Sequence, residues 1–282
     1  MQEIELANQV LNKFNEIVNT GRAYPFDKTK KIKIGVDLGT SSIVLVVLDN
    51  ENQPVYGSFR YADVIRDGLV VDYIRSVDIV RTLKAEAEKV LGISLAKAAG
   101  AVPPGTIGKN KSVVKYVIES ADMEVEDIVD EPTAASCLLK INNGAVVDVG
   151  GGTTGISTFI NGEVQNVFDE PTGGTHMTLV LAGYNGISFE EAEKLKRKKC
   201  KEEENFLVIR PVVEKMADIT QKALQSNGNK SNYPIYIVGG ASNFSDFSDT
   251  FSNYLDRPVL KTAYPQFVTP IGIAMSCGKE VD

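Results

Sequence analysis

Two copies of one short pattern constrain the fold of this 282-residue chain more than any other feature. In each copy an apolar, β-branched strand runs into Asp-x-Gly, hydroxyl-bearing residues follow, and a second strand begins. The copies start at Asp37 and Asp148. A later strand, residues 235–238, ends in another glycine pair. Strands that feed repeatedly into glycine turns, with helical segments between them, predict an α/β fold.

The glycine triplet of the second copy, residues 150–152, needs a physical reason. Glycine inside regular structure costs roughly 0.5–1 kcal/mol relative to alanine. A tight hairpin turn is one reason, although two residues are enough for such a turn. Close approach of the backbone to an anion is the other, because successive N–H groups without Cβ atoms form a concave nest for phosphate. The second copy of the pattern favours the phosphate interpretation.

The three glycine turns define a candidate nucleotide site. Asp37 and Asp148 are hard oxygen ligands suited to Mg²⁺, which we expect them to hold through its waters. The hairpin residues expected to bind phosphate are Gly39, Thr40, Ser41, Gly150, Gly151, Gly152, Thr153 and Thr154. The turn Gly239-Gly240-Ala241 is expected to let a nucleotide base lie against backbone.

Composition excludes several classes of function. A net charge of −7 argues against a nucleic-acid-binding surface, and the basic run 194–201 is expected to be a solvated helix face of mixed charge. No apolar run is long enough to span a membrane, and we expect no signal peptide. The three cysteines fit no disulfide framework, so we expect a cytoplasmic protein. The one histidine, His176, is expected in a loop or helix cap, with a ligand contact as the alternative.

Residues 1–20 are expected to form an amphipathic helix, because apolar residues recur at spacings of three and four. Two interpretations remain open. The helix packs on the domain that follows it, or its apolar face docks into a groove of another protein.

The two Asp-Gly-Thr hairpins and the late strand–Gly-Gly turn resemble those of the actin-like ATPase superfamily, which includes actin, sugar kinases, DnaK-type chaperones, MreB and FtsA. The resemblance implies a ribonuclease H-like α/β fold with two lobes around a cleft that binds ATP and Mg²⁺. Lobe I would be residues 31–143 with 261–282, and lobe II residues 144–260. Residues 1–30 would form the preceding helix and linker.

Further motifs carry this resemblance. Glu131 opens Glu-Pro-Thr-Ala-Ala, where Pro132 suits the first turn of a helix and Glu131 its dipole. The superfamily resemblance gives Glu131 a second role, near the γ-phosphate, where it orients the attacking water. By the same resemblance, Gly173-Gly174 would lie next to ribose and phosphate, Glu193 would accept from the ribose hydroxyls, and Lys196 would lie along the base. Ordinary surface-helix roles for Glu193 and Lys196 remain the alternative.

Over residues 31–275 the chain resembles the EutJ family of chaperone-like proteins from ethanolamine-utilisation operons. The motifs are Gly-Val-Asp-Leu-Gly-Thr-Ser at 35–41, Asp-Gly-Leu-Val-Val-Asp at 67–72, Glu131 to Ala135, Asp148 to Thr154 and Gly239-Gly240. This implies an ATP-binding chaperone-like or reactivating factor with a slow ATPase. Its client would be an ethanolamine-degrading enzyme or a protein of a bacterial microcompartment.

Two departures from the DnaK-type pattern leave other functions open. Gly155 stands where those proteins carry an aspartate, and the sequence ends at Asp282, so we expect no peptide-binding domain. A filament-forming actin-like protein and a nucleotide-binding scaffold without turnover are the main alternatives. A small-molecule kinase is disfavoured, because there is no large insertion to shape a substrate pocket.

Overall fold

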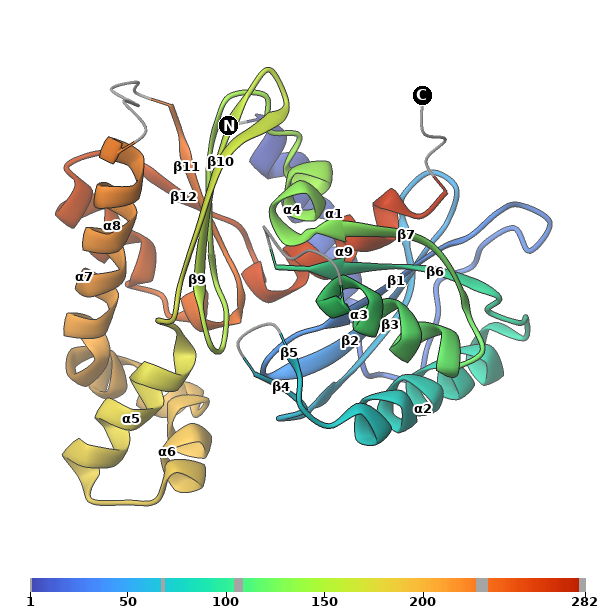
Figure 1. Cartoon of the computed structure of the whole chain (residues 1–282), viewed down its shortest axis with the longest axis horizontal. Coiled ribbons are helices and arrows are strands. Elements are labelled where there is room, and N and C mark those ends of the chain that lie inside the picture. The colour runs from blue at the N-terminus through green and yellow to red at the C-terminus, as the bar shows by residue number, and fades with distance from the viewer. Residues whose placement is uncertain (1, 67–68, 104–108, 227–232, 279–282) are drawn as a thin grey trace. The chain divides into compact units, whose positions relative to one another are not determined.

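The computed structural model describes residues 2–66, 69–103, 109–226 and 233–278. The chain divides into two compact units, Met1–Ile141 with Thr262–Asp282, and Asn142–Lys261. Each unit is built on one five-stranded sheet, and helices accompany both sheets (Figure 1). The α/β class predicted from the sequence is therefore confirmed.

The first unit contains the sheet β3-β2-β1-β6-β7. Its strands are β1 (Lys33–Leu38), β2 (Ser42–Leu48), β3 (Pro54–Tyr61), β6 (Lys97–Val102) and β7 (Glu124–Asp130). A two-stranded ribbon, β4 (Ile65–Arg66) with β5 (Leu69–Val70), lies outside this sheet. β1 pairs antiparallel with β2 and parallel with β6, and β6 pairs parallel with β7. The Asp67-Gly68 turn of the sequence motif lies outside the described residues.

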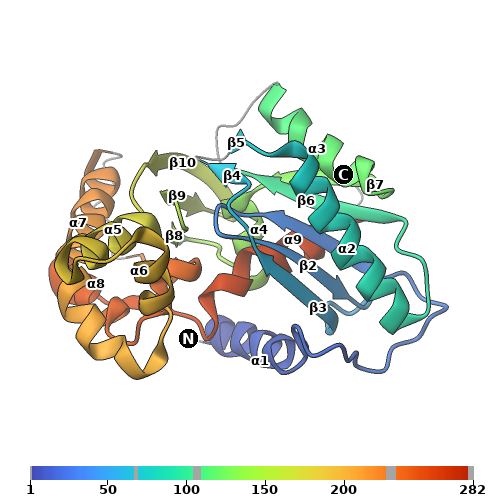
Figure 2. The same ribbon diagram turned by 90° about the horizontal axis from the view of Figure 1, so that it is seen from below.

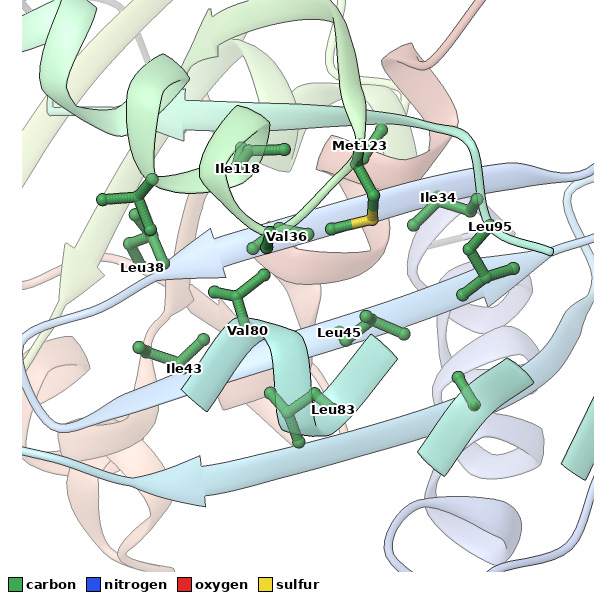
Figure 3. Close-up of a cluster of buried hydrophobic side chains, with 14 of the residues drawn as sticks. Ile34, Val36, Leu38, Ile43, Leu45, Val80, Leu83, Leu95, Ile118 and Met123 are labelled. Atoms are coloured by element: carbon green, nitrogen blue, oxygen red, sulfur yellow. The ribbon is translucent and has the colours of Figure 1, made fainter. Parts of the chain in front are cut away.

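Helices pack on this first sheet because their apolar residues match its buried side chains. α2 (Tyr73–Leu91) and α3 (Lys109–Ser120) contribute Val80, Leu83 and Ile118 to the main core. From the strands come Ile34, Val36, Leu38, Ile43 and Leu45, and Figure 3 shows these side chains lying among those of the helices. Full burial of such side chains supplies the main driving force for folding of this unit.

Two further helices of the first unit, α4 (Glu131–Leu139) and α9 (Val268–Ser276), pack against each other at very close range. A Cβ atom built on Gly272 of α9 would lie 1.8 Å from the carbonyl oxygen of Ala134. Only glycine permits that approach, so Gly272 allows the two helix backbones to touch.

α1 (Gln2–Ile17) is the amphipathic helix expected at the N-terminus, and Figure 2 shows it on the opposite side of the first sheet from α2. Ala7, Leu11 and Phe14 are at most 1 % exposed. The Phe14 ring meets Phe267 edge to face, with centroids 5.0 Å apart, and the Asn8 side chain accepts a hydrogen bond from the backbone N–H of Ala263. The helix therefore packs on its own unit, and its apolar face is covered rather than presented to a partner.

The second unit repeats the topology of the first, with the sheet β10-β9-β8-β11-β12. Its strands are β8 (Gly144–Val149), β9 (Thr154–Ile160), β10 (Glu163–Glu170), β11 (Ile235–Val238) and β12 (Val259–Lys261). β8 pairs antiparallel with β9 and parallel with β11, as β1 does with β2 and β6. The sequence repeat around the two aspartates is thus a repeat of sheet topology.

The helices of the second unit are α5 (Gly174–Asn185), α6 (Phe189–Lys196), α7 (Glu202–Ser226) and α8 (Phe247–Leu255). Buried side chains of α7 and α8, with Met177 and Leu181 of α5, form a core with strands β8 and β11. None of the described helices is long and apolar enough to cross a membrane.

Candidate functional site

Both hairpins have the same local geometry. Asp37 and Asp148 are each the penultimate residue of a strand, β1 or β8. The backbone N–H of Gly39 donates to the Ser42 carbonyl, and that of Gly150 donates to the Thr153 carbonyl, each at 3.0 Å. Each aspartate therefore precedes a four-residue turn closed by one backbone hydrogen bond.

In the first unit the predicted residues gather at one edge of the sheet. β1, β6 and β7 are parallel, so the turn after Leu38 and the start of α4 after Asp130 both follow carboxyl ends of strands. Glu131 is the first residue of α4, and the Asp130 carboxylate caps that helix by accepting from Thr133 N–H at 2.9 Å. One strand separates β1 from β7, so the turn and Glu131 share the edge where ligands bind in open α/β sheets.

In the second unit the hairpin 150–153 is held against the start of α5. The backbone N–H groups of Gly174 and Thr175 donate to the carbonyls of Gly150 and Gly151, at 3.0 and 2.8 Å. A Cβ atom on Gly173 would lie 2.7 Å from the Gly150 carbonyl oxygen. Hairpin and helix therefore meet at their backbones, and the hairpin carbonyls satisfy the first N–H groups of the helix.

That contact explains why α5 begins at Gly174, within a glycine turn. Gly-Gly is a turn signal, and the carbonyls that cap the helix come from residues more than twenty positions earlier. His176 consequently lies exposed in the first turn of α5, so the prediction of a loop or cap position is wrong.

The Thr154 hydroxyl, predicted to bind phosphate, has an internal partner. It is fully buried and donates to the Thr172 carbonyl at 2.6 Å. Thr154 thus ties the hairpin to the segment before Gly173, while Thr153 remains partly exposed in the turn.

Gly239 brings the end of β11 against Asp148. Its φ of 89° lies in the left-handed region that favours glycine, and a Cβ there would lie 2.3 Å from Asp148 Oδ1. The turn that follows, Gly240–Asn243, is supported by Lys261, whose Nζ donates to the carbonyls of Ser242 and Phe244 at 3.3 and 2.5 Å. Burial lowers the pKa of Lys261. Sequence reasoning missed this lysine, because a single lysine in a short strand carries no signal of its partners.

Glu193 and Lys196 of α6 form a largely buried ion pair below Gly174. Lys196 Nζ lies 2.7 Å from Glu193 Oε2, 2.8 Å from the Thr178 hydroxyl and 2.9 Å from the Gly174 carbonyl. The Lys196 side chain is 12 % exposed, so the basic run is not the wholly solvated helix face expected from the sequence. Ala241 also lies against Gly174, because a Cβ atom built on Gly174 would be 3.3 Å from the Cβ atom of Ala241.

The pKa values of this pair follow from burial and charge. Burial lowers the pKa of Lys196. Burial opposes ionisation of Glu193, but the neighbouring Lys196 and Arg197 outweigh it and lower its pKa. Each group's opposite charge favours the charged form of the other. Their hydrogen bonds fix α6 to the glycine turn.

The second unit thus assembles one contiguous cluster from four separate segments: the hairpin, the Gly173-Gly174 turn, the Glu193–Lys196 pair and the Gly239–Ala241 turn. Three of the four segments are glycine turns, and Asp148 is the carboxylate that lies against them. No group of three or more His, Cys, Asp or Glu side chains within the described residues could hold a metal ion without help. This donor set suits a phosphate-bound Mg²⁺ that keeps several of its waters.

Comparison with known proteins defines the class first. The chain matches the model of the cell division protein FtsA over residues 145–275 and that of the Hsp70 protein over residues 74–204. Its fold resembles that of MreB 5 of Spiroplasma citri bound to AMPPNP, with a TM-score of 0.70 over 86 % of this chain and 94 % of that one, at 16 % identity. The fold is that of the actin-like ATPases.

The particular family follows from nearer relatives. The chain is 41 % identical to the ethanolamine utilization protein EutJ of Escherichia coli (strain K12), over 88 % of this chain and 86 % of that one. The crystal structure of EutJ from Carboxydothermus hydrogenoformans superposes with a TM-score of 0.92, at 45 % identity over 98 % of this chain and 99 % of that one. This protein belongs to the EutJ family.

Proposed function

We propose that this protein binds Mg²⁺-ATP and acts as a nucleotide-dependent, chaperone-like factor in ethanolamine utilisation. The observation that carries the proposal is the cluster in the second unit, where Gly150, Gly173 and Gly239 bring three backbone turns around Asp148. Glycine turns without Cβ atoms, packed around one carboxylate, leave room for a phosphate group and its metal ion to approach the backbone.

The residues take distinct roles in this proposal. The hairpin residues Gly39 to Ser41 and Gly150 to Thr153 bind phosphate oxygens, and Asp37 and Asp148 orient the waters of Mg²⁺. The turn Gly239-Gly240-Ala241 lies against the base. The Glu193–Lys196 pair, whose polar atoms already bond to each other and to Thr178, fixes Gly173-Gly174 beside the ribose.

Turnover is proposed to be slow. Glu131 is the first residue of α4. In this proposal its carboxylate orients the attacking water. Gly155 removes one carboxylate from the metal side of the hairpin, which reduces the charge available to hold Mg²⁺ during hydrolysis. The same glycine motivates the second candidate, a nucleotide-binding scaffold that does not hydrolyse ATP. Steady-state phosphate release from the parent, compared with Glu131→Gln, separates the two.

The partner is proposed from the family. Relatives at 40–41 % identity bear the name ethanolamine utilization protein EutJ, so the client proposed here is an ethanolamine-degrading enzyme or a microcompartment protein of the same pathway. The cytoplasm is the proposed location.

The test is thermal unfolding with and without Mg²⁺-ATP, for the parent and for Gly150→Ala. A Cβ at Gly150 meets nothing nearer than the Thr153 carbonyl at 3.4 Å, so the substitution fits the ligand-free protein. A ligand at 100 times its Kd adds about 2.7 kcal/mol, which raises the Tm of a protein of this size by several degrees at roughly 2–4 °C per kcal/mol.

We expect this rise in the parent and its loss in Gly150→Ala, because the added methyl group fills the space that a phosphate oxygen needs. Gly183→Ala, at a position where a Cβ meets no atom within 4 Å, is the matched control and should keep the rise. No rise in the parent at millimolar nucleotide would refute nucleotide binding. Recovery of an inactivated ethanolamine-degrading enzyme by the parent and not by Gly150→Ala checks the client.

A further inference from the structure

Helix α5 has one buried face and one exposed apolar face. Gly174, Met177, Thr178 and Leu181 point into the unit. The opposite face carries His176, Leu179, Val180, Gly183 and Tyr184, which we call the outer seam of α5. Leu179, Val180 and Tyr184 are 53 %, 39 % and 74 % exposed.

The spacing of the outer seam is that of a packed helix face. Its residues recur at i, i+3, i+4, i+7 and i+8, the pattern by which a helix normally contacts its neighbours. α5 carries no charged residue along its whole length. Charged residues are depleted and aromatic residues enriched at the centres of protein interfaces. A helix that is apolar on both faces is therefore expected to have a second partner.

Gly183 adds an independent observation. It lies inside α5, where glycine is a poor helix former, and a Cβ atom there would meet no atom within 4 Å. The chain itself gives no steric reason for glycine at this position. Close approach of another backbone to the seam does give one.

Charges at the two ends of the seam indicate what that partner is. Lys198 follows the basic end of α6, which lies beside the first turn of α5 because Lys196 Nζ contacts the Gly174 carbonyl. Glu190 lies in the first turn of α6, just after the turn that ends α5. Both are exposed, and neither forms an ion pair with a described residue. One end of the seam thus offers a positive charge and the other a negative charge, and α5 and α6 are neighbours in Figure 1.

We propose that the outer seam of α5 is a homodimer contact, in which α5 packs antiparallel to α5 of a second copy. A two-fold axis near Val180 makes the contact self-complementary, as in most homodimers. Lys198 of each copy then faces Glu190 of the other, and Gly183 receives the first turn of the opposite seam. A standard protein interface buries about 800 Å² on each partner, and a single helix face buries less. The dimer is therefore weak and forms at micromolar concentrations.

Sedimentation velocity from about 1 µM to about 1 mM, the range of weak association, tests the proposal. The parent should shift from monomer to dimer, with or without nucleotide. The double substitution Leu179→Ser with Val180→Ser should weaken association at least tenfold. Ile74→Ser, which removes a still more exposed apolar side chain from α2 of the first unit, should leave it unchanged.

A glycine variant and a set of charge variants separate dimerisation from folding. Gly183→Ala should raise the Tm of the dilute protein, because alanine favours the helix, yet weaken the dimer, because the methyl group blocks close approach. Glu190→Lys and Lys198→Glu should each weaken the dimer, and the two together should restore it. A parent that stays monomeric throughout overturns the proposal, and so does a double charge variant that associates no better than the single ones.

Discussion

Gly155 lies in register between two carboxylates of the second sheet. It pairs with Asp148 of β8 on one side and with Asp169 of β10 on the other. Residues directly opposite each other in neighbouring strands point to the same face. An ideal Cβ on Gly155 would lie 4.0 Å from Asp169 Oδ1, so there is room for a side chain, and glycine leaves the row with two carboxylates instead of three.

Gly155→Asp should therefore lower the stability of the metal-free protein by about 1 kcal/mol, because like charges directly opposite in a sheet repel. Mg²⁺ with ATP should recover that loss and should accelerate hydrolysis, because the third carboxylate adds to the charge around the metal. Urea unfolding with and without Mg²⁺-ATP measures the first effect, and phosphate release measures the second.

The matched control for this change is Gly155→Asn, which has the same shape without the charge. Equal destabilisation by Asn and Asp would show that crowding and not charge is responsible. An Asp variant that Mg²⁺-ATP leaves no more stable than the Asn variant would remove Asp148 and its neighbours from the metal site.

Among the elements, α5 and α6 are joined by a polar contact in addition to the apolar core that they share. Thr178 of α5 meets both Glu193 and Lys196 of α6, and Arg197 donates to the second carboxylate oxygen of Glu193 at 2.8 Å. Because Lys196 also holds the Gly174 carbonyl, the pair determines where α5 begins relative to the hairpin. Breaking a buried pair leaves one charge without its partner, which is costly.

The pH dependence of stability should report this pair. The pKa of Glu193 is lowered below 4.5 in the folded protein. Between that value and 4.5 the unfolded chain binds more protons than the folded one, so stability rises with pH there and is lost as the pH falls through the folded pKa. Glu193→Gln should flatten the slope below pH 4.5 and cost roughly 2–3 kcal/mol at pH 7.

Urea unfolding at a series of pH values between 3 and 7 measures both effects. Glu203→Gln, on the exposed first turn of α7, is the control and should change neither. A slope that is the same in Glu193→Gln as in the parent would contradict the assignment of this acid-sensitive stability to the α5–α6 contact.

The elements also show how far sequence reasoning reaches. The hairpins, the strand after them and the buried face of α1 follow from local signals: alternation, glycine turns and helical spacing. The start of α5 and the internal role of Thr154 do not follow from local signals. Their hydrogen-bond partners are the backbone carbonyls of Gly150, Gly151 and Thr172, which are distant in sequence. Lys261, and Lys196 through its bond to Gly174, likewise contact backbone carbonyls, which leave no trace in a sequence.

At the scale of the whole molecule, the two units share one sheet topology and one hairpin geometry. The chain passes from one unit to the other at residues 141–142 and again at 261–262. Helices α4 and α9 of the first unit lie next to these two passages, and their backbones touch at Gly272 and Ala134. A ligand that contacts both hairpins would favour whichever arrangement of the units lets both bind it at once.

Nucleotide should therefore change the distance between the units. The chain offers a native cysteine to which a dye can be attached to measure that distance. Cys200 is exposed in the second unit, while burial raises the pKa of the Cys277 thiol to about 11 and keeps it unreactive near neutral pH. Ile74→Cys, at a 74 % exposed position in the first unit, supplies the second site in a Cys137→Ser background.

We expect energy transfer between dyes at positions 74 and 200 to shift on addition of Mg²⁺-ATP and to differ with Mg²⁺-ADP, because the γ-phosphate adds contacts to the hairpins. Gly150→Ala in the same background should show no shift, and work at nanomolar concentration, below the range of the proposed dimer, keeps transfer within one copy. If the parent binds Mg²⁺-ATP by thermal unfolding and yet transfer is unchanged, the nucleotide serves stability alone and the proposed switch is wrong. A shift that reverses as ATP is hydrolysed would instead link turnover to the movement through which a client could be engaged and released.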